Sequence, residues 1–421
     1  MKQCSHHVMP SRTPTAFSFV FLPSLVLSFV FLQCCTLFPS TAAFLLPSSS
    51  LSSTSSDYYS SSSLRRRVAL QMQGEGSGTG KSVAGRSFLR SKPIGVGSAA
   101  PADVIKNTDL ESVVETSDEW IFTRTGISQR RILPSGGQIR GLAATAAARA
   151  LENAGLEGKD IDVVILATSS PDDLFGDATS VAAAVGATGA VAFDLTAACS
   201  GFLFGVVTAS QFLHSGCYRH ALVVGADALS RWVDWEDRNS CILFGDGAGA
   251  VVLTVAEGDA DSGVLGFAMH SDGTGQGDLN LQFAKDESQS PPEINAVTPY
   301  KGKYNNIAMN GKEVYKFATR KVPTVIEEAL ANAGLGVEEV DWLLLHQANI
   351  RIMDVVADRL GLSKDKILTN LSDYGNTSAG SIPLALDEAV KSGKVKKGDI
   401  IACAGFGAGL SWGSAIIRWQ G

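Results

Sequence analysis

The chain has 421 residues and a formal net charge of −7, with 42 acidic and 35 basic side chains. This mildly acidic balance, without basic blocks after residue 92, argues against nucleic-acid binding and suits a soluble enzyme. Four of the seven cysteines follow residue 92, and their wide spacing matches neither a metal site nor a disulfide framework. We therefore expect no bound metal, and a reducing compartment for Cys199, Cys217, Cys241 and Cys403.

The first 72 residues differ in composition from the rest of the chain. They contain one acidic residue, Asp57, and an apolar run over Ala16–Phe38 that Pro23 and several serines interrupt. A basic start, this run and the small residues that follow it are typical of a cleavable signal peptide, here 1–43. The run is long enough to span a bilayer, so a membrane anchor is the alternative, although the interruptions argue against it.

Phe44 follows the expected cleavage site, and the stretch 44–91 is rich in serine, contains three consecutive arginines and is poor in acidic residues. This order resembles the bipartite presequence of algae with secondary plastids, in which a transit peptide beginning with Phe follows the signal peptide. The resemblance implies a protein of the plastid stroma, without stable membrane association once the leader is removed. A plain secretory signal and a mitochondrial leader are the alternatives.

The remaining chain contains an internal repeat. Ala150–Leu166 aligns without gaps with Ala329–Leu345, 179 residues further on, and His220–Gly225 aligns with Ile400–Gly405 at an offset of 180. In the first pair a predicted helix ends at a glycine and a short turn leads into an apolar strand. The near-constant offset indicates one duplication. We expect two similar halves, 92–265 and 266–421.

Helices and strands alternate in each half. In the first half we expect helices over 140–153 and 200–214, and strands over Val163–Ala167 and Ala221–Val224. Strands that are apolar at every position are typical of sheets covered on both faces. The pattern therefore predicts a layered α/β fold, with functional residues in loops at strand ends and between the halves.

Cys199 is the strongest candidate nucleophile. The strand Val191–Leu195 leads through small residues into a predicted helix, and Cys199 lies at or near the start of that helix. Free backbone N–H groups and the helix dipole favour a thiolate at such a position. The alternative is a buried structural cysteine, which we expect for the other three cysteines of this part of the chain.

Two polar residues of the second half are candidate partners. His346 directly follows the repeated strand, where the first half has Ala167 and Thr168, and a histidine that only filled the core would not need that position. Asn376 lies among glycines and small residues before a predicted helix, so it is either a helix cap or a functional amide. The glycine-rich turn 405–409 could place a backbone N–H beside a reacting carbonyl, but its spacing is wrong for a dinucleotide site.

Five motifs together resemble the β-ketoacyl-acyl-carrier-protein synthase III family. They are TSDEWIFTRTGI (116–127), DLTAACSGF (194–202), HQANIRI (346–352), GNTSAGSIP (375–383) and GFGAGLSWG (405–413). The resemblance implies a thiolase fold with αβαβα layers, a homodimer, and a catalytic triad of Cys199, His346 and Asn376. It implies condensation of a short acyl-coenzyme A with malonyl-acyl carrier protein, initiating type II fatty acid synthesis, without further cofactors.

The same resemblance implies further roles. The backbone N–H groups of Cys199 and Ala408 would form the oxyanion hole, Phe244 would line the acyl pocket, and Lys316 and Arg351 would contact acyl carrier protein. The residues that would bind coenzyme A are Thr116, Trp120, Arg124, Arg238, Gly311 and Asn349.

The sequence departs from the family pattern at two places. Ala408 replaces one of three consecutive glycines, a change that keeps the backbone N–H. Asp172–Gly186, which we expect to line the acyl pocket, differs more and is one residue shorter than in the family pattern. The sequence therefore does not determine the length of the starter acyl chain. The alternatives are a related coenzyme-A-dependent condensing enzyme with another starter group and a catalytically idle homologue that binds acyl carrier protein.

Overall fold

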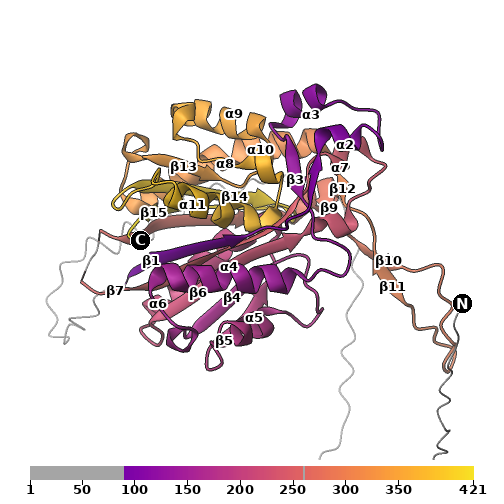
Figure 1. Cartoon of the computed structure of the whole chain (residues 1–421), viewed down its shortest axis with the longest axis horizontal. Coiled ribbons are helices and arrows are strands. Elements are labelled where there is room, and N and C mark those ends of the chain that lie inside the picture. Colours follow the sequence, from indigo (N-terminus) through magenta and orange to yellow (C-terminus); the bar gives the residue numbers. More distant parts are fainter. Residues whose placement is uncertain (1–89, 259–260) are drawn as a thin grey trace, which may run out of the picture. The chain divides into compact units, whose positions relative to one another are not determined.

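The computed structural model describes residues 90–258 and 261–421 (Figure 1). The predicted signal and transit segments therefore lie outside the described residues, except that residues 90 and 91 begin the first strand. In the part that the structure describes, no helix combines the length and the apolar character needed to cross a membrane.

One mixed sheet has five strands. In spatial order they are β1 (Arg90–Ala99), β7 (Asp246–Ala256), β6 (His220–Ala228), β4 (Val163–Ala167) and β5 (Val191–Leu195). β4 is parallel to both β5 and β6, whereas β7 is antiparallel to β6 and β1. All five residues of β4 are buried, as its continuous apolar sequence predicts for a strand covered on both faces.

The second sheet repeats this arrangement. Its strands, in spatial order, are β13 (Trp342–Leu345), β14 (Ile400–Gly407), β15 (Ser411–Arg418) and β8 (Gly263–Ser271). β13 is parallel to β14, and β15 is antiparallel to both of its neighbours. The counterpart of β5 is reduced to one parallel bridge between Leu343 and Ile367. The boundary that we predicted between residues 265 and 266 falls inside β8.

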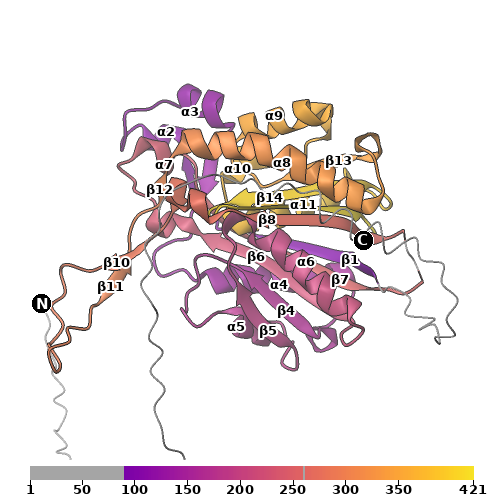
Figure 2. The same cartoon turned by 180° about the vertical axis from the view of Figure 1, so that it is seen from behind.

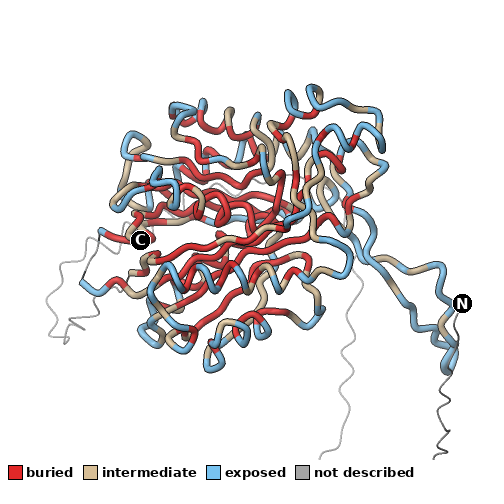
Figure 3. Tube along the Cα trace, viewed as in Figure 1, coloured by how far each residue is buried: buried red, intermediate tan, exposed pale blue. Residues whose placement is uncertain are grey.

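Helices form three layers around the two sheets (Figures 1 and 2). α6 (Gly201–His214) and α11 (Ser381–Lys391) share one apolar cluster with strands of both sheets, so they form the central layer. α4 (Ile139–Ala154) and α5 (Ala178–Ala184) cover the first sheet, and α8 (Gly311–Ala333) and α9 (Ile350–Leu360) cover the second. Figure 3 shows buried chain concentrated in these inner layers. The predicted layered αβαβα fold is confirmed.

Short elements surround one end of the sheets. They are the helices α2 (Asn107–Leu110), α3 (Asp118–Thr125), α7 (Arg238–Cys241) and α10 (Leu371–Tyr374), and the strands β2 (Val104–Lys106), β3 (Gln129–Arg131), β9 (Leu279–Asn280), β10 (Phe283–Lys285), β11 (Gly302–Tyr304) and β12 (Ala308–Met309). The 3₁₀ turns are η1 (Gly158–Asp160), η2 (Ala198–Ser200), η3 (Leu229–Trp232), η4 (Gly273–Asp278), η5 (Val337–Glu339), η6 (Lys364–Lys366) and η7 (Ser378–Gly380).

Glycines allow the central layer to approach the first sheet closely. A Cβ atom at Gly225 of β6 would lie 2.1 Å from the carbonyl oxygen of Ala379, and one at Gly249 of β7 would lie 2.6 Å from the backbone nitrogen of Leu384. Neither distance is compatible with a side chain. These two positions therefore set how near η7 and α11 of the second half can lie to the first sheet.

We predict that Gly225→Ala lowers the free energy of unfolding by about 1–3 kcal/mol, because the new methyl group must displace backbone atoms of η7. Gly141→Ala in α4 is the matched control, since a Cβ there meets no atom within 4 Å. The control should raise the free energy of unfolding by about 0.4–1 kcal/mol. Equal effects of the two substitutions in chemical denaturation would contradict this account of the packing.

Candidate active site

Cys199 lies in a tight turn between β5 and α6. It belongs to η2, the turn that directly precedes α6, and the residue is 7% exposed. Ala198 has a left-handed φ of 47°, which is unusual for a residue with a Cβ and aims this turn at the second half. A Cβ atom at Gly407 would lie 2.9 Å from both the backbone nitrogen and Cβ of Cys199. β14 can therefore approach Cys199 this closely only because residue 407 is a glycine.

The electrostatic surroundings of Cys199 differ from the sequence-based expectation of a thiolate. Burial raises the pKa of the Cys199 thiol to about 12, and the buried Asp227 carboxylate acts in the same direction. The Ser378 hydroxyl, whose Oγ lies 3.4 Å from Sγ, lowers the pKa without reversing the effect. Burial therefore outweighs the favourable position at a helix start, and the resting side chain is a thiol.

His346 follows β13 and is held as a neutral imidazole. Its backbone nitrogen donates to the carbonyl of Ala404 at 2.8 Å, which continues the pairing of β13 with β14. Nδ1 lies 2.8 Å from Ser381 Oγ, and the ring meets the ring of Phe406 edge-on with centroids 5.2 Å apart. Burial lowers the pKa of His346 to about 3. The ring is therefore neutral at physiological pH.

Asn376 is fixed through its backbone and one side-chain oxygen. Its backbone nitrogen donates to the carbonyl of Leu243 at 2.8 Å, and its carbonyl accepts from the nitrogen of Gly245 at 3.0 Å. Its Oδ1 accepts from the backbone nitrogen of Ser378 at 2.9 Å. Because the oxygen is occupied, the amide NH₂ group is the end that remains available to donate. Asn376 is not the N-cap of α11, which is Gly380, but its Oδ1 contact satisfies the first backbone N–H of η7, so a cap-like role and a functional amide are compatible.

Two short segments join the three predicted triad residues. Ser378 contacts Cys199 through its hydroxyl and Asn376 through its backbone nitrogen. In β14, Gly407 packs against Cys199 while the neighbouring Phe406 contacts His346. These contacts therefore link the three buried residues indirectly, through η7 and β14.

Sequence reasoning missed Ser378, Ser381 and Asp227. The turn η7 repeats η2 at an offset of 180 residues, and Ser378 has a left-handed φ of 49° like its counterpart Ala198. Extending the internal repeat beyond its apolar strands would have identified this second turn.

Asp227 is fully buried at the end of β6 and accepts hydrogen bonds from the backbone nitrogens of Ser169 at 2.7 Å and Ala379 at 3.1 Å, which ties η7 to the first sheet. Burial raises its pKa.

A group of predicted binding residues surrounds α3. The guanidinium groups of Arg124 and Arg238 lie 4.6 Å and 4.7 Å from the ring centroid of Trp120. Asn349 Nδ2 donates to the carbonyl of Arg124, and an Arg351 guanidinium nitrogen donates to that of Thr123, each at 3.1 Å. These contacts bring α3, α7 and the start of α9 together.

The remaining predicted residues lie in different settings. Thr116 Oγ1 is buried and has no hydrogen-bond partner among the described residues. Gly311 begins α8, and Lys316, one turn further, forms an ion pair of 2.6 Å with Glu313. Phe244 is buried beside Asn376, with which it forms a parallel bridge. Ala408 follows β14, and its carbonyl accepts from Ser411 Oγ at 3.1 Å. Residues 90–258 and 261–421 contain no group of three His, Cys, Asp or Glu side chains that could hold a metal.

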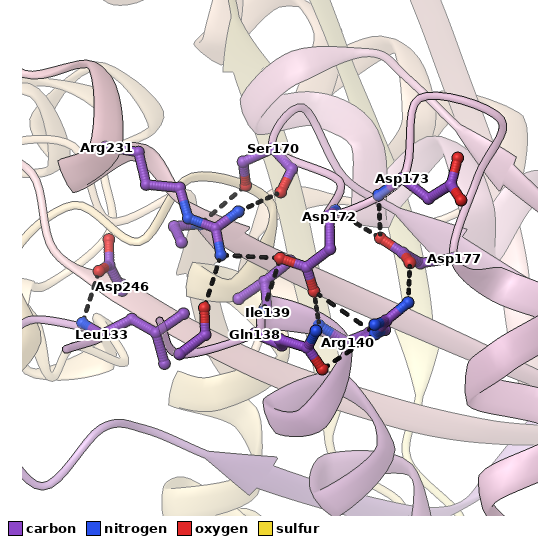
Figure 4. Close-up of polar contacts among 12 residues, drawn as sticks. Leu133, Gln138, Ile139, Arg140, Ser170, Asp172, Asp173, Asp177, Arg231 and Asp246 are labelled. Atoms are coloured by element: carbon purple, nitrogen blue, oxygen red, sulfur yellow. Dashed lines mark hydrogen bonds and ion pairs between the residues drawn. The ribbon is translucent and has the colours of Figure 1, made fainter. Parts of the chain in front are cut away.

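The loop before α5 belongs to the segment that we expected to line the acyl pocket. Asp172 accepts from Arg231 at 2.7 Å and from the backbone nitrogen of Arg140 at 3.0 Å, and Asp177 accepts from the nitrogen of Asp172 at 2.6 Å (Figure 4). These bonds hold the base of the loop and leave its tip, Leu174 and Phe175, 80% and 99% exposed. Leu174 and Phe175 therefore reach solvent beside β5, and both line a cavity of this chain together with Phe193 and Asp194.

Comparisons with known proteins place the chain in one family. A model of the family 3-oxoacyl-[acyl-carrier-protein (ACP)] synthase III matches residues 193–273, and the model of its C-terminal part matches residues 330–419. The chain is 58% identical over 325 residues to the β-ketoacyl-[acyl-carrier-protein] synthase III of Microcystis aeruginosa, covering 77% of this chain and 96% of the relative. That of Synechococcus elongatus is 57% identical over 326 residues, with the same two coverages.

Solved structures give the same result. The crystal structure of 3-oxoacyl-[acyl-carrier-protein] synthase III from Aquifex aeolicus has a TM-score of 0.71 and 43% identity, covering 78% of this chain and all of that one. The corresponding structure from Pseudomonas aeruginosa has a TM-score of 0.70 and 38% identity, covering 79% of this chain and 99% of the other. With the motifs, the duplicated fold and the buried cysteine, histidine and asparagine in agreement, the chain belongs to the β-ketoacyl-[acyl-carrier-protein] synthase III family.

Proposed function

We propose that this protein joins an acetyl group, or another short acyl group, from coenzyme A to malonyl-acyl carrier protein with loss of carbon dioxide. The product is a 3-ketoacyl-acyl carrier protein, and the reaction is the first condensation of type II fatty acid synthesis. The observation that carries the proposal is the burial of Cys199, His346 and Asn376, together with the contacts that link them through Ser378 and β14. Both thioesters are substrates, and the proposal needs no metal or redox cofactor.

Acyl transfer to Cys199 is the first step. Sγ attacks the thioester carbonyl carbon, the bond from that carbon to the coenzyme A sulfur breaks, and the thiol proton leaves with the coenzyme A sulfur. Because burial raises the pKa of Cys199 to about 12, proton transfer accompanies the attack and does not precede it. The backbone N–H groups of Cys199 and Ala408 are the proposed donors to the developing oxyanion.

Decarboxylation and carbon–carbon bond formation follow. The neutral imidazole of His346 and the amide NH₂ of Asn376 donate hydrogen bonds to the malonyl thioester carbonyl. Carbon dioxide then departs, and the electron pair that it leaves forms an enolate that both donors stabilise. The enolate carbon attacks the acyl carbonyl, and the bond to Cys199 Sγ breaks. Sγ takes up a proton and the thiol is restored.

The proposed site for coenzyme A extends from Trp120. An indole flanked by Arg124 and Arg238 can accept a purine by stacking, with one guanidinium displaced onto the outer face of the base. The unpartnered Oγ1 of Thr116 supports a polar ligand beside this group. Asn349 and Gly311 complete the proposed coenzyme A contacts, and Phe244 lines the site near the reacting carbonyl.

Lys316 and Arg351 are the proposed contacts to acyl carrier protein. Their positive charges lie on α8 and at the start of α9, beside the elements that carry the proposed coenzyme A contacts. An acidic carrier is attracted to such exposed cations over about 8–10 Å at physiological ionic strength. The salt dependence of the KM for malonyl-acyl carrier protein tests this role.

We also propose the plastid stroma as the location. The presequence pattern lies outside the described residues, but the similar proteins of Microcystis aeruginosa and Synechococcus elongatus are cyanobacterial, which fits a protein of plastid ancestry. A reporter fused to residues 1–73 should reach the plastid of an alga with secondary plastids, and its secretion would contradict the proposal.

A homodimer is proposed from the exposed features at the edge of the first sheet. β5 is the edge strand, Val191 at its start is 45% exposed, and the neighbouring loop presents Leu174 and Phe175 to solvent. A cavity of about 340 Å³ lies between this loop and β5, lined in part by Phe175, Phe193 and Asp194. An unpaired strand edge next to exposed apolar side chains favours pairing with a second copy.

We predict a dimer by sedimentation velocity, weakened at least about tenfold in Kd by Phe175→Ser, since one buried phenylalanine contributes about 1.5–3 kcal/mol. Phe283→Ser is the matched control, because Phe283 is also exposed, at 53%, but lies in β10, outside this surface. A monomer at micromolar concentration, or equal effects of the two substitutions, would contradict the proposal.

The functional proposal predicts a division of labour. His346→Ala and Asn376→Ala should still accept an acetyl group on Cys199 but condense about 10²–10³-fold more slowly, because each removes one donor to the enolate oxygen. Mass spectrometry of the product formed from acetyl-coenzyme A and malonyl-acyl carrier protein measures condensation, and the mass of the intact enzyme measures loading. Normal condensation by either variant, or absence of a 3-ketoacyl product from the unmodified protein, would refute the proposed mechanism.

A further inference from the structure

The Ser381 hydroxyl lies between two polar atoms of the segment that carries His346. Ser381 Oγ is 2.8 Å from His346 Nδ1 and 3.4 Å from the backbone nitrogen of Gln347. Both Ser381 and His346 are buried, at 1% and 2% exposure, so water cannot replace these contacts freely. Within the described part of the chain, these two atoms are the hydrogen-bond partners of this hydroxyl.

Counting protons distinguishes the two neutral forms of His346. The Gln347 N–H can only donate, so Ser381 Oγ accepts from it. If Nδ1 carried the ring proton, Oγ would accept from both neighbours and its own hydrogen would have no acceptor in a buried site. If Nδ1 is unprotonated, the hydroxyl donates to it and all three groups are satisfied.

We propose that Ser381 is a positioning residue that fixes the neutral imidazole of His346 with its proton on Nε2. The hydrogen bond occupies Nδ1, and the contact with Phe406 holds the plane of the ring. Nε2, on the opposite side of the ring, is then a donor. This inference rests on the proposed function in one respect, namely that the group receiving the Nε2 proton is the malonyl thioester carbonyl.

The internal repeat supports a dedicated role for Ser381. His346 corresponds to Ala167 at an offset of 179, and Ser381, the first residue of α11, corresponds to Gly201, the first residue of α6. A Cβ atom at Gly201 would lie 3.2 Å from Cβ of Ala167, so the equivalent pair is also in contact in the first half. The same junction therefore has no polar side chain in one half and an imidazole with a hydroxyl in the other.

The form of the ring can be observed without substrate. Two-bond nitrogen–proton correlation NMR on the protein labelled with ¹⁵N-histidine distinguishes the Nε2–H and Nδ1–H forms, and His346→Ala identifies the His346 signals. We expect the Nε2–H form in the unmodified protein and in Ser381→Thr, and a mixture of both forms in Ser381→Ala. An Nδ1–H form of His346 in the unmodified protein overturns the proposal. A folded Ser381→Ala variant in which His346 is still entirely in the Nε2–H form overturns it as well.

Kinetics provide a second readout. Ser381→Ala should lower kcat for condensation at least about tenfold, because part of the enzyme then lacks the Nε2 donor, whereas acetylation of Cys199 should change less than about twofold. Ser381→Thr should restore most of the condensation rate. Normal condensation by Ser381→Ala overturns the positioning role. If the unmodified protein shows the Nε2–H form yet yields no 3-ketoacyl product, the proposed function fails while the assignment of the ring proton stands.

Discussion

The close approach of β14 to the turn that carries Cys199 is the constraint on which the rest of the site depends. Gly407 leaves no room for a Cβ atom against Cys199, and the next residue back, Phe406, meets the ring of His346. On the other side, Gly225 lets the carbonyl of Ala379 reach β6, so the turn η7 lies beside Cys199. The two turns can approach the strands beside them this closely only because β14 and β6 lack side chains at Gly407 and Gly225.

This packing also sets the protonation states. A site closed between two sheets is desolvated, which disfavours charge on any group that lacks a partner of opposite charge. Burial raises the pKa of the Cys199 thiol and lowers that of His346, so both resting side chains are neutral. Neutrality suits a histidine that donates a hydrogen bond and a cysteine that gives up its proton only as a thioester arrives. Two hydroxyls contact these neutral groups: Ser378 Oγ lies 3.4 Å from Cys199 Sγ, and Ser381 Oγ lies 2.8 Å from His346 Nδ1.

Local patterns in the sequence predicted much of the fold and part of the site. The apolar runs at Val163–Ala167 and Trp342–Leu345 became β4 and β13, because uninterrupted apolar strands must be covered on both faces. The repeat placed His346 at a strand end, and family motifs supplied the functional roles. Ser381 was missed because its importance lies in a contact across 35 residues, which no local pattern reports. The exposure of Phe175 was missed because carboxylate contacts from distant elements decide the course of its loop.

The central claim, that Cys199 receives the acyl group inside this buried site, is tested most directly by peptide mass mapping after incubation with acetyl-coenzyme A alone. The account predicts an acetyl group on Cys199 and none on Cys217, Cys241 or Cys403. It also predicts that the labelling rate changes little between pH 7 and 9, because the raised pKa keeps Cys199 a thiol over this range and its proton leaves only during the attack. Acetyl label on one of the other three cysteines, with Cys199 unmodified, would contradict the account.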